Sequence, residues 1–271
     1  MLSLFRIMTQ RTGSIYNVRL SAGLGLLDET RSLLDLWEPG MSPSTLHEVA
    51  LASGRFPTIT SRRLLNIVKD CFAPRYLVND GKPAARLKNL KNRMPTSELN
   101  QFYLLFTCRA NAILNDFVRE IYWERYASGF AEISNLDAEK FVRRAIDDGK
   151  TQKRWAEKTI KNVAGYLTGC CADYGLLEKG HKTIRRILPF RISPSMAGYL
   201  AYDLHFAGLG DNAVLSHPDW RIFGLAVYDV REELKRLALK GYLILQSAGD
   251  ITRISWKYKT MEELCDVLAK G

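Results

Sequence analysis

The chain has 271 residues, of which 46% are hydrophobic and 25% are charged, with 39 Lys and Arg against 29 Asp and Glu. This composition excludes an intrinsically disordered chain, and the length exceeds the ~100–200 residues of a typical domain, so we expect two or three compact units. The net charge of +10 favours a polyanionic partner, either a nucleic acid or an anionic membrane surface.

Membrane insertion, secretion and metal binding are not indicated by the sequence. The longer uncharged stretches, 99–108 and 192–202, are shorter than the ~18–20 apolar residues of a membrane-spanning helix. Arg6 interrupts the apolar opening residues before they reach the ~7–15 residues of a secretory signal core. The five cysteines lack a C-x-x-C pair, and the four histidines lack metal-ligand spacing. We therefore expect a cytoplasmic protein with reduced cysteines, no metal and no cofactor.

The first quarter of the chain predicts a series of helices. An amphipathic helix over 22–37 ends before Pro39, and a short helix over 44–53 follows. A glycine-bearing turn at 54–57 then leads into a helix over about 60–72. Helix, short turn and helix is the outline of a helix-turn-helix, although plain helical hairpins share it.

The helix over 60–72 separates apolar from polar side chains. At about 100° per residue, its apolar residues share one side: Leu64, Ile67, Val68 and Cys71. Arg62, Asn66 and Lys69 share the opposite side, and these residue types suit guanine, adenine and phosphate in a major groove. Thr60 and Ser61 are candidates to cap the helix and to donate to a phosphate. The alternative is an ordinary solvated helix face.

Residues 82–93 are basic and contain few large apolar side chains. Pro83 and Pro95 lie near the two ends of this segment. We interpret it as either a basic wing or a flexible connection to the next unit.

The middle of the chain predicts an α-helical bundle. A long apolar helix over 98–126 and a helix over 137–146 precede a third helix over 151–177. The third helix carries apolar residues at spacings of three and four, with cations on the opposite face: Arg154, Lys158 and Lys161. These cations are candidates to follow a phosphate backbone. Cations on an exposed helix are, however, commonly only solubilising.

The last unit predicts the second half of a winged helix. A helix over 195–208 opens the unit, and a helix over 229–240 with Asp229 as its N-cap follows. Two strands, 242–246 and 251–256, are joined by a turn at 247–250.

Charged and apolar side chains also separate in this segment. The helix has an apolar stripe of Val230, Leu234 and Leu237, and the return strand turns Ile254, Trp256 and Tyr258 to one side. The opposite faces carry the cations that we predict to contact DNA: Arg231, Lys235, Arg253 and Lys257. The alternative is an ordinary hairpin with solubilising lysines.

The sequence contains no convincing catalytic constellation. Residues 175–183 nearly spell a phosphate-binding loop, but His181 interrupts the spacing and a helix rather than a strand precedes them. Acid pairs such as Asp147 and Asp148 are adjacent, so their side chains point in different directions on a helix. A binding protein is therefore favoured over an enzyme.

Two regions carry a family resemblance. Residues 16–31 form a glycine-rich opening that ends in Glu29-Thr30-Arg31. A later helix, 155–177, leads to a strand over 187–192 that contains Pro189. In these motifs the chain resembles the BrxA family of BREX bacteriophage-exclusion systems, from Tyr16 to the C-terminus.

The resemblance implies a cytoplasmic, mostly helical accessory protein that binds double-stranded DNA through helix-turn-helix-like units toward its ends. It also implies a phage-defence setting that includes an adenine methyltransferase, an ATPase, a phosphatase-like protein and a protease. Other BREX proteins are thus further candidate partners.

The sequence predicts a mainly α-helical fold with helix-turn-helix or winged-helix units at both ends, a central helical bundle and few short strands. We expect three units, 1–95, 96–192 and 193–271. The expected function is non-enzymatic binding of duplex DNA, driven largely by phosphate contacts and with weak sequence specificity. Two alternatives stay open: a protein-interaction scaffold and an RNA-binding helical protein, although the aromatic signatures of common RNA-binding modules are absent.

Overall fold

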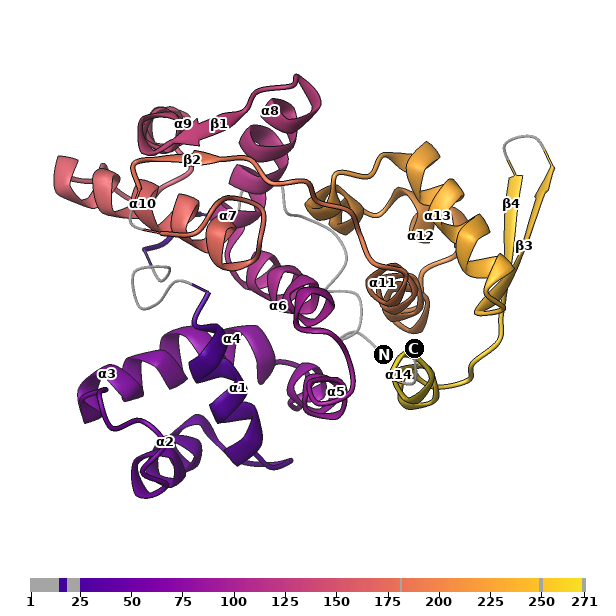
Figure 1. Cartoon of the computed structure of the whole chain (residues 1–271), viewed down its shortest axis with the longest axis horizontal. Helices are drawn as coiled ribbons and strands as arrows, with labels where there is room; N and C mark the ends of the chain where they lie inside the picture. Colours follow the sequence, from indigo (N-terminus) through magenta and orange to yellow (C-terminus); the bar gives the residue numbers. More distant parts are fainter. Residues whose placement is uncertain (1–14, 19–24, 181, 249–250, 270–271) are drawn as a thin grey trace.

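The computed structural model of the chain describes residues 15–18, 25–180, 182–248 and 251–269. Helices dominate these residues, and the strands form two small antiparallel pairs, β1 with β2 and β3 with β4 (Figure 1). The mainly helical fold expected from the sequence is therefore confirmed. Residues 22–24 of the first predicted helix, His181 and part of the predicted turn at 247–250 lie outside the described residues.

The N-terminal helices are, in order, α1 (Leu27–Leu36), α2 (Pro43–Ala52), α3 (Ser61–Asn66), the π-helical η3 (Ile67–Phe72), α4 (Ala73–Tyr76) and α5 (Lys82–Leu90). Helix α1 begins later than predicted because Leu26 has a left-handed backbone, with φ of 49°. The predicted helix over 60–72 is present, but it continues through η3 into α4. The wider turns of η3 accommodate extra backbone without ending the helix.

The interpretation of residues 82–93 as a wing or a flexible connection is wrong. Most of this segment is α5, whose Pro83 lies at the start of the helix, where its missing N–H has no consequence. Ala84, Leu87 and Leu90 recur every three residues and are fully buried. This narrow apolar stripe packs α5 against α1, α4, α6 and α14.

The central elements are α6 (Thr96–Ala110), α7 (Ala112–Phe117), the π-helical η4 (Val118–Tyr122), α8 (Trp123–Ala127), β1 (Glu132–Ser134), α9 (Asn135–Asp147), α10 (Glu157–Asp173) and β2 (Ile184–Arg186). The single helix predicted over 98–126 is interrupted at Asn111. The backbone of Asn111 is extended, with φ of −131° and ψ of 96°. Its side chain donates to the Thr107 carbonyl at 3.0 Å, which also accepts the Asn111 backbone N–H at 3.0 Å.

The C-terminal elements are α11 (Pro194–Phe206), α12 (Asp211–Ser216), the 3-10 helix η5 (Pro218–Phe223), α13 (Val227–Leu239), β3 (Leu243–Ala248), β4 (Ile251–Trp256) and α14 (Met261–Leu268). Strand β3 pairs with β4 in the predicted hairpin, with Leu243 opposite Trp256. The last helix, α14, folds back onto earlier elements: it lies between α5 and α11 and packs against both (Figure 1). One hydrophobic core cluster includes buried residues from all three predicted units.

Candidate nucleic-acid interface

Helix α3 and the π-helical η3 that follows it present the predicted polar face to solvent. Its four apolar residues are buried, as predicted: Leu64, Ile67, Val68 and Cys71. Arg62, Asn66 and Lys69 are all exposed. Their side chains form no hydrogen bond or ion pair with another residue that the structure describes. These three side chains, called the α3 face below, are therefore available to a partner.

The start of α3 is capped as predicted. The Thr60 hydroxyl oxygen accepts a hydrogen bond from the Arg63 backbone N–H at 3.3 Å, and Thr60 has the extended backbone typical of an N-cap. Ser61 is exposed, and its carbonyl lies 3.2 Å from His47 Nε2 on α2, which ties the two helices together. Phosphate contact by either hydroxyl stays a prediction. Arg63 is also exposed and is a further candidate for phosphate contact. The sequence pattern did not indicate it because it lies between the apolar and the polar side of the helix.

The predicted basic stripe on α10 is shorter than expected. Lys158 and Lys161 are exposed on the helix, and neither pairs with an acid among the described residues. Arg154, however, precedes the helix, which begins only at Glu157, and its guanidinium pairs with Asp147 at 2.9 Å. Thr151 forms a β-bridge with Tyr16, and Ala156 is the N-cap of the helix with an extended backbone. The interpretation of Arg154 as a helix-face residue is thus wrong.

Helix α13 carries both predicted cations, in different environments. Lys235 is exposed, but Nζ bonds Glu232 at 2.7 Å. Arg231 is half-buried and makes interactions within the chain. Tyr228 is 70% exposed and lies three and seven residues before these cations, so the three share one side of the helix. The sequence pattern did not indicate Tyr228 as a candidate contact residue, because aromatic residues usually join the core.

The predicted N-cap of α13 is wrong. The helix begins at Val227, and Ala226 is its N-cap. Asp229 instead lies inside the first turn, where its carboxylate accepts the Ala226 backbone N–H at 2.9 Å. An acid in the first turn satisfies a free N–H and also interacts favourably with the helix dipole, so the same residue type suits both positions.

The β3–β4 hairpin is anchored to the helices by polar contacts. Tyr202 on α11 donates its hydroxyl to the Tyr242 carbonyl at 2.6 Å and accepts the Lys257 N–H at 2.9 Å. Burial raises the pKa of Tyr202, which keeps this donor protonated at neutral pH. On α12, Asp211 accepts the Ile254 N–H at 3.0 Å. The hairpin therefore has a defined position on the helices.

The hairpin has the alternation that the sequence predicts. Ile254 is buried and Trp256 is half-buried, whereas Arg253 and Ser255 are exposed. Arg253 makes no ion pair within the described part of the chain. Lys257 is exposed, but its Nζ donates to the Gly241 carbonyl at 3.0 Å.

A buried ion-pair network joins the N-terminal helices, which include the α3 face, to the C-terminal helices, which hold the β3–β4 hairpin. Asp203 on α11 bonds Arg86 on α5 and Arg109 on α6, each at 2.7 Å. Arg109 also bonds Asp219 in η5 at 2.7 Å. Burial lowers the pKa of Arg109, but Asp219 and Asp203 outweigh it and raise the pKa, so the guanidinium stays charged. We call these four residues the Asp203 clamp.

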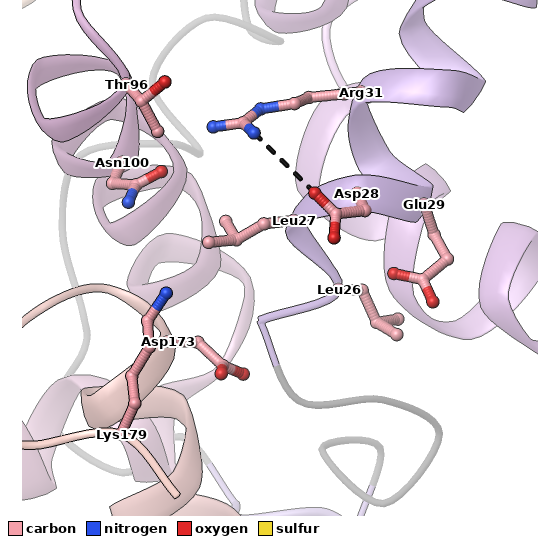
Figure 2. Close-up of a pocket in the computed structure, with 9 residues that line it drawn as sticks. All are labelled: Leu26, Leu27, Asp28, Glu29, Arg31, Thr96, Asn100, Asp173 and Lys179. Atoms are coloured by element: carbon pink, nitrogen blue, oxygen red, sulfur yellow. Dashed lines mark ion pairs between the residues drawn. The ribbon is translucent and has the colours of Figure 1, made fainter.

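A polar recess of about 340 Å³ lies where α1, α6 and the end of α10 meet (Figure 2). Its lining has both signs of charge, with Asp28 3.7 Å from Arg31 and with Asp173 and Lys179 nearby. Asp173 accepts the Gly25 N–H at 2.8 Å, which fixes the chain where it enters α1. Small-molecule sites are typically apolar with a few polar groups, and this recess is not of that kind. The described residues also contain no group of His, Cys, Asp and Glu arranged to hold a metal.

Comparison with known proteins places this architecture in a family. The family model named BrxA matches residues 14–203. The chain belongs to the BrxA family. Membership of the BrxA family implies a component of a BREX phage-defence system. The match ends at Asp203, so it is shorter than the resemblance expected from the sequence and leaves α12, α13, the hairpin and α14 outside it.

A solved structure shares the fold of this BrxA-family chain. The crystal structure of an uncharacterized protein from Magnetospirillum magneticum is similar with a TM-score of 0.56 and 13% sequence identity. The similarity covers 71% of this chain and 95% of that chain. No curated protein matches the chain. In the described part of this BrxA-family chain, no helix has the length and hydropathy needed to cross a bilayer.

Proposed function

We propose that this BrxA-family chain is a non-enzymatic, duplex-DNA-binding accessory component of its BREX system. The observation that carries the proposal is the α3 face, where Arg62, Asn66 and Lys69 are exposed opposite a fully buried apolar side. Arginine and asparagine match base edges in a major groove, and lysine matches phosphate.

The surroundings of the α3 face support a helix-turn-helix unit. Helix α2 packs against α3, and residues 53–60 connect them. In such units the second helix enters the major groove while the first crosses the backbone. The hydroxyls of Thr60 and Ser61 at the start of α3 would then lie near phosphates.

The C-terminal elements support a second, winged-helix unit. Helices α11, α12 and α13 are followed by the β3–β4 hairpin, which α12 and α13 contact. Arg253 on the hairpin and Lys235 on α13 would contact phosphates, together with Arg231 and Lys257. Because most of these cations already have partners within the chain, this end would contribute less affinity per cation than the α3 face.

Most of the expected affinity is electrostatic and therefore independent of sequence. The net charge of +10 attracts a polyanion at long range, and Lys158 and Lys161 on α10 are further phosphate candidates. Arg154 stays a weaker candidate because Asp147 neutralises it. Only Arg62 and Asn66 on the α3 face are suited to base edges, so we expect weak sequence preference.

A protein-interaction scaffold is the second candidate function. Phe130, Leu136 and Ile184 are each more than half exposed, at 55%, 59% and 52%. They lie around the β1–β2 pair, in which Ile184 is opposite Ser134. Exposed apolar residues are a common feature of protein-binding surfaces when they form a contiguous patch. A protein partner could bind here while DNA binds to other parts of the chain. If the chain bound no nucleic acid, this would be its main functional surface.

A gel-shift titration with duplex DNA and duplex RNA over a range of salt separates the candidates. If ~6 phosphates are neutralised, the logarithm of the affinity for DNA falls with the logarithm of the salt concentration at a slope of about −5. Stronger binding to duplex RNA would favour the RNA alternative. Absence of a shift with either nucleic acid at low salt would refute the proposal and favour the scaffold.

A further inference from the structure

Helix α3 and the β3–β4 hairpin lie toward opposite ends of the longest axis of the molecule, with the Asp203 clamp region between them (Figure 1). We infer that one chain binds two separate duplex segments, one at each end, and so bridges them. The inference rests on the proposed function, to which it adds the number and arrangement of the bound duplexes.

The two ends are joined by buried contacts. In the Asp203 clamp, the side chains of Arg86 and Asp203 are only 15% and 18% exposed, and one carboxylate serves arginines from α5 and α6. Opening such a network would leave a buried charge without its partner. Helix α14 adds an apolar contact because it packs against α5 on one side and α11 on the other. Each duplex would therefore be held in a fixed orientation relative to the other.

The seam between the ends disfavours one duplex that runs along the molecule. Helix α14 lies in this seam and carries three acidic side chains and no basic one. Glu262, Glu263 and Asp266 are all exposed, and Asp266 pairs with Arg93 at 3.4 Å. A duplex laid across α14 would bring its phosphates toward the carboxylates of Glu262 and Glu263.

A duplex long enough to span the molecule distinguishes the two arrangements. A compact chain of this length has a radius of gyration of about 18 Å, which corresponds to a diameter of roughly 50 Å. A stem of about 24 base pairs, closed by a small loop, is ~80 Å long, so both ends could grip the same stem if one duplex ran along the molecule, and each chain would then bind one stem. Analytical ultracentrifugation with a fluorescent stem at low salt then counts the duplexes bound to each chain. We expect two per chain at saturation.

Charge-reversal variants assign the two duplexes to the two ends. Arg62→Glu with Lys69→Glu, and separately Arg253→Glu with Lys257→Glu, should each reduce the count to one, and all four together should abolish binding. Lys140→Glu with Arg186→Glu is the matched control, because it reverses two exposed cations on α9 and β2. This control should keep two duplexes per chain. Arg253→Glu alone replaces the second pair if the loss of the Lys257 contact to Gly241 disturbs the hairpin.

A bead assay tests bridging directly. A biotinylated stem on beads should retain a second, fluorescent stem only through the wild type and the control, and not through either end variant. A count of one duplex per chain for the wild type would overturn the inference while leaving the proposed function intact. Absence of any bound duplex at low salt would instead refute the proposed function itself.

Discussion

Arg62, Asn66 and Lys69 share one exposed face, but each can recognise a different part of a duplex. We assign the Lys69 ammonium to phosphate, a contact that carries no base information, whereas the asparagine amide can bond an adenine edge. The face was predictable because the helical period alone separates it from its buried side. The engagement of Lys257 by the Gly241 carbonyl was not predictable, because that contact depends on how the hairpin folds back.

The first prediction concerns Lys69. Lys69→Gln should weaken binding to every duplex by a similar factor and should reduce the salt slope by about 0.9, because one phosphate contact is lost. Fluorescence anisotropy with several unrelated sequences over a salt series measures both quantities. Lys140→Gln, at an exposed lysine on α9, should change neither quantity. A loss of affinity confined to one sequence would contradict the phosphate role.

The second prediction concerns Asp203, whose carboxylate serves two largely buried arginines. Asp203→Asn should lower the free energy of unfolding by about 3–5 kcal/mol, because both arginines lose their charged partner. Urea denaturation at neutral pH measures this loss. Asp266→Asn is the control, since Asp266 is exposed and its 3.4 Å pair with Arg93 is worth about 1 kcal/mol at most. Equal effects of the two substitutions would argue against a special role for the clamp.

Among the elements, those with a strong apolar period were predictable and those defined by tertiary contacts were not. The periods of α3, α9 and α13 are visible in the sequence because their large apolar residues recur at helical spacing. Helix α5 was missed because alanine occupies part of its narrow apolar stripe. The non-helical backbone at Thr151, where a helix was predicted to begin, was missed because Thr151 pairs with Tyr16, which lies far away in the sequence.

The third prediction concerns the start of α9. The Ser134 hydroxyl oxygen accepts the Asp137 N–H at 3.1 Å, and the Asp137 carboxylate accepts the Ser134 N–H at 2.9 Å. Burial raises the pKa of Asp137, but hydrogen bonds from Ser134 and the charge of Arg125 outweigh it and lower the pKa. The ionised carboxylate therefore stabilises the fold at neutral pH. This contribution is lost as the pH falls through the lowered pKa.

Asp137→Asn should accordingly lower the free energy of unfolding by about 1 kcal/mol at neutral pH. The difference from the wild type should shrink as the pH falls below the usual aspartate pKa of about 3.9. Urea denaturation at several pH values measures it. Asp148→Asn, at the other end of α9, is the matched control and should show little effect. A difference that grows on acidification would show that the ionised Asp137 carboxylate does not stabilise the fold.

At the scale of the whole molecule, helix α14 was not predicted, and neither was its position between the ends. Its buried residues pack on partners in α5 and α11 that lie far away in the sequence, so no local pattern reports them. The division into three units stays a prediction. Because α14 packs against both α5 and α11, a substitution that weakens the packing of α14 should destabilise both of these helices.

The fourth prediction tests that coupling. Leu264→Ala removes a fully buried side chain of α14 and should lower the free energy of unfolding by about 2–5 kcal/mol. Hydrogen exchange should accelerate in both α5 and α11, because both lose a packing partner. Leu239→Ala makes the same chemical change where leucine is 89% exposed, and should shift stability by about 0.5 kcal/mol or less. Acceleration confined to α11 would show that the units open independently.

The Asp203 clamp has a consequence for DNA loops. Two segments of one DNA molecule can be held by a rigid chain only when their grooves present the required rotational phase. On the two-segment proposal, the yield of loops should therefore oscillate as the spacing between the segments changes, with a period of about 10.5 base pairs. An Asp203→Asn chain that still folds should flatten this oscillation. The Asp203 carboxylate would then help to fix the rotational orientation of one bound duplex relative to the other.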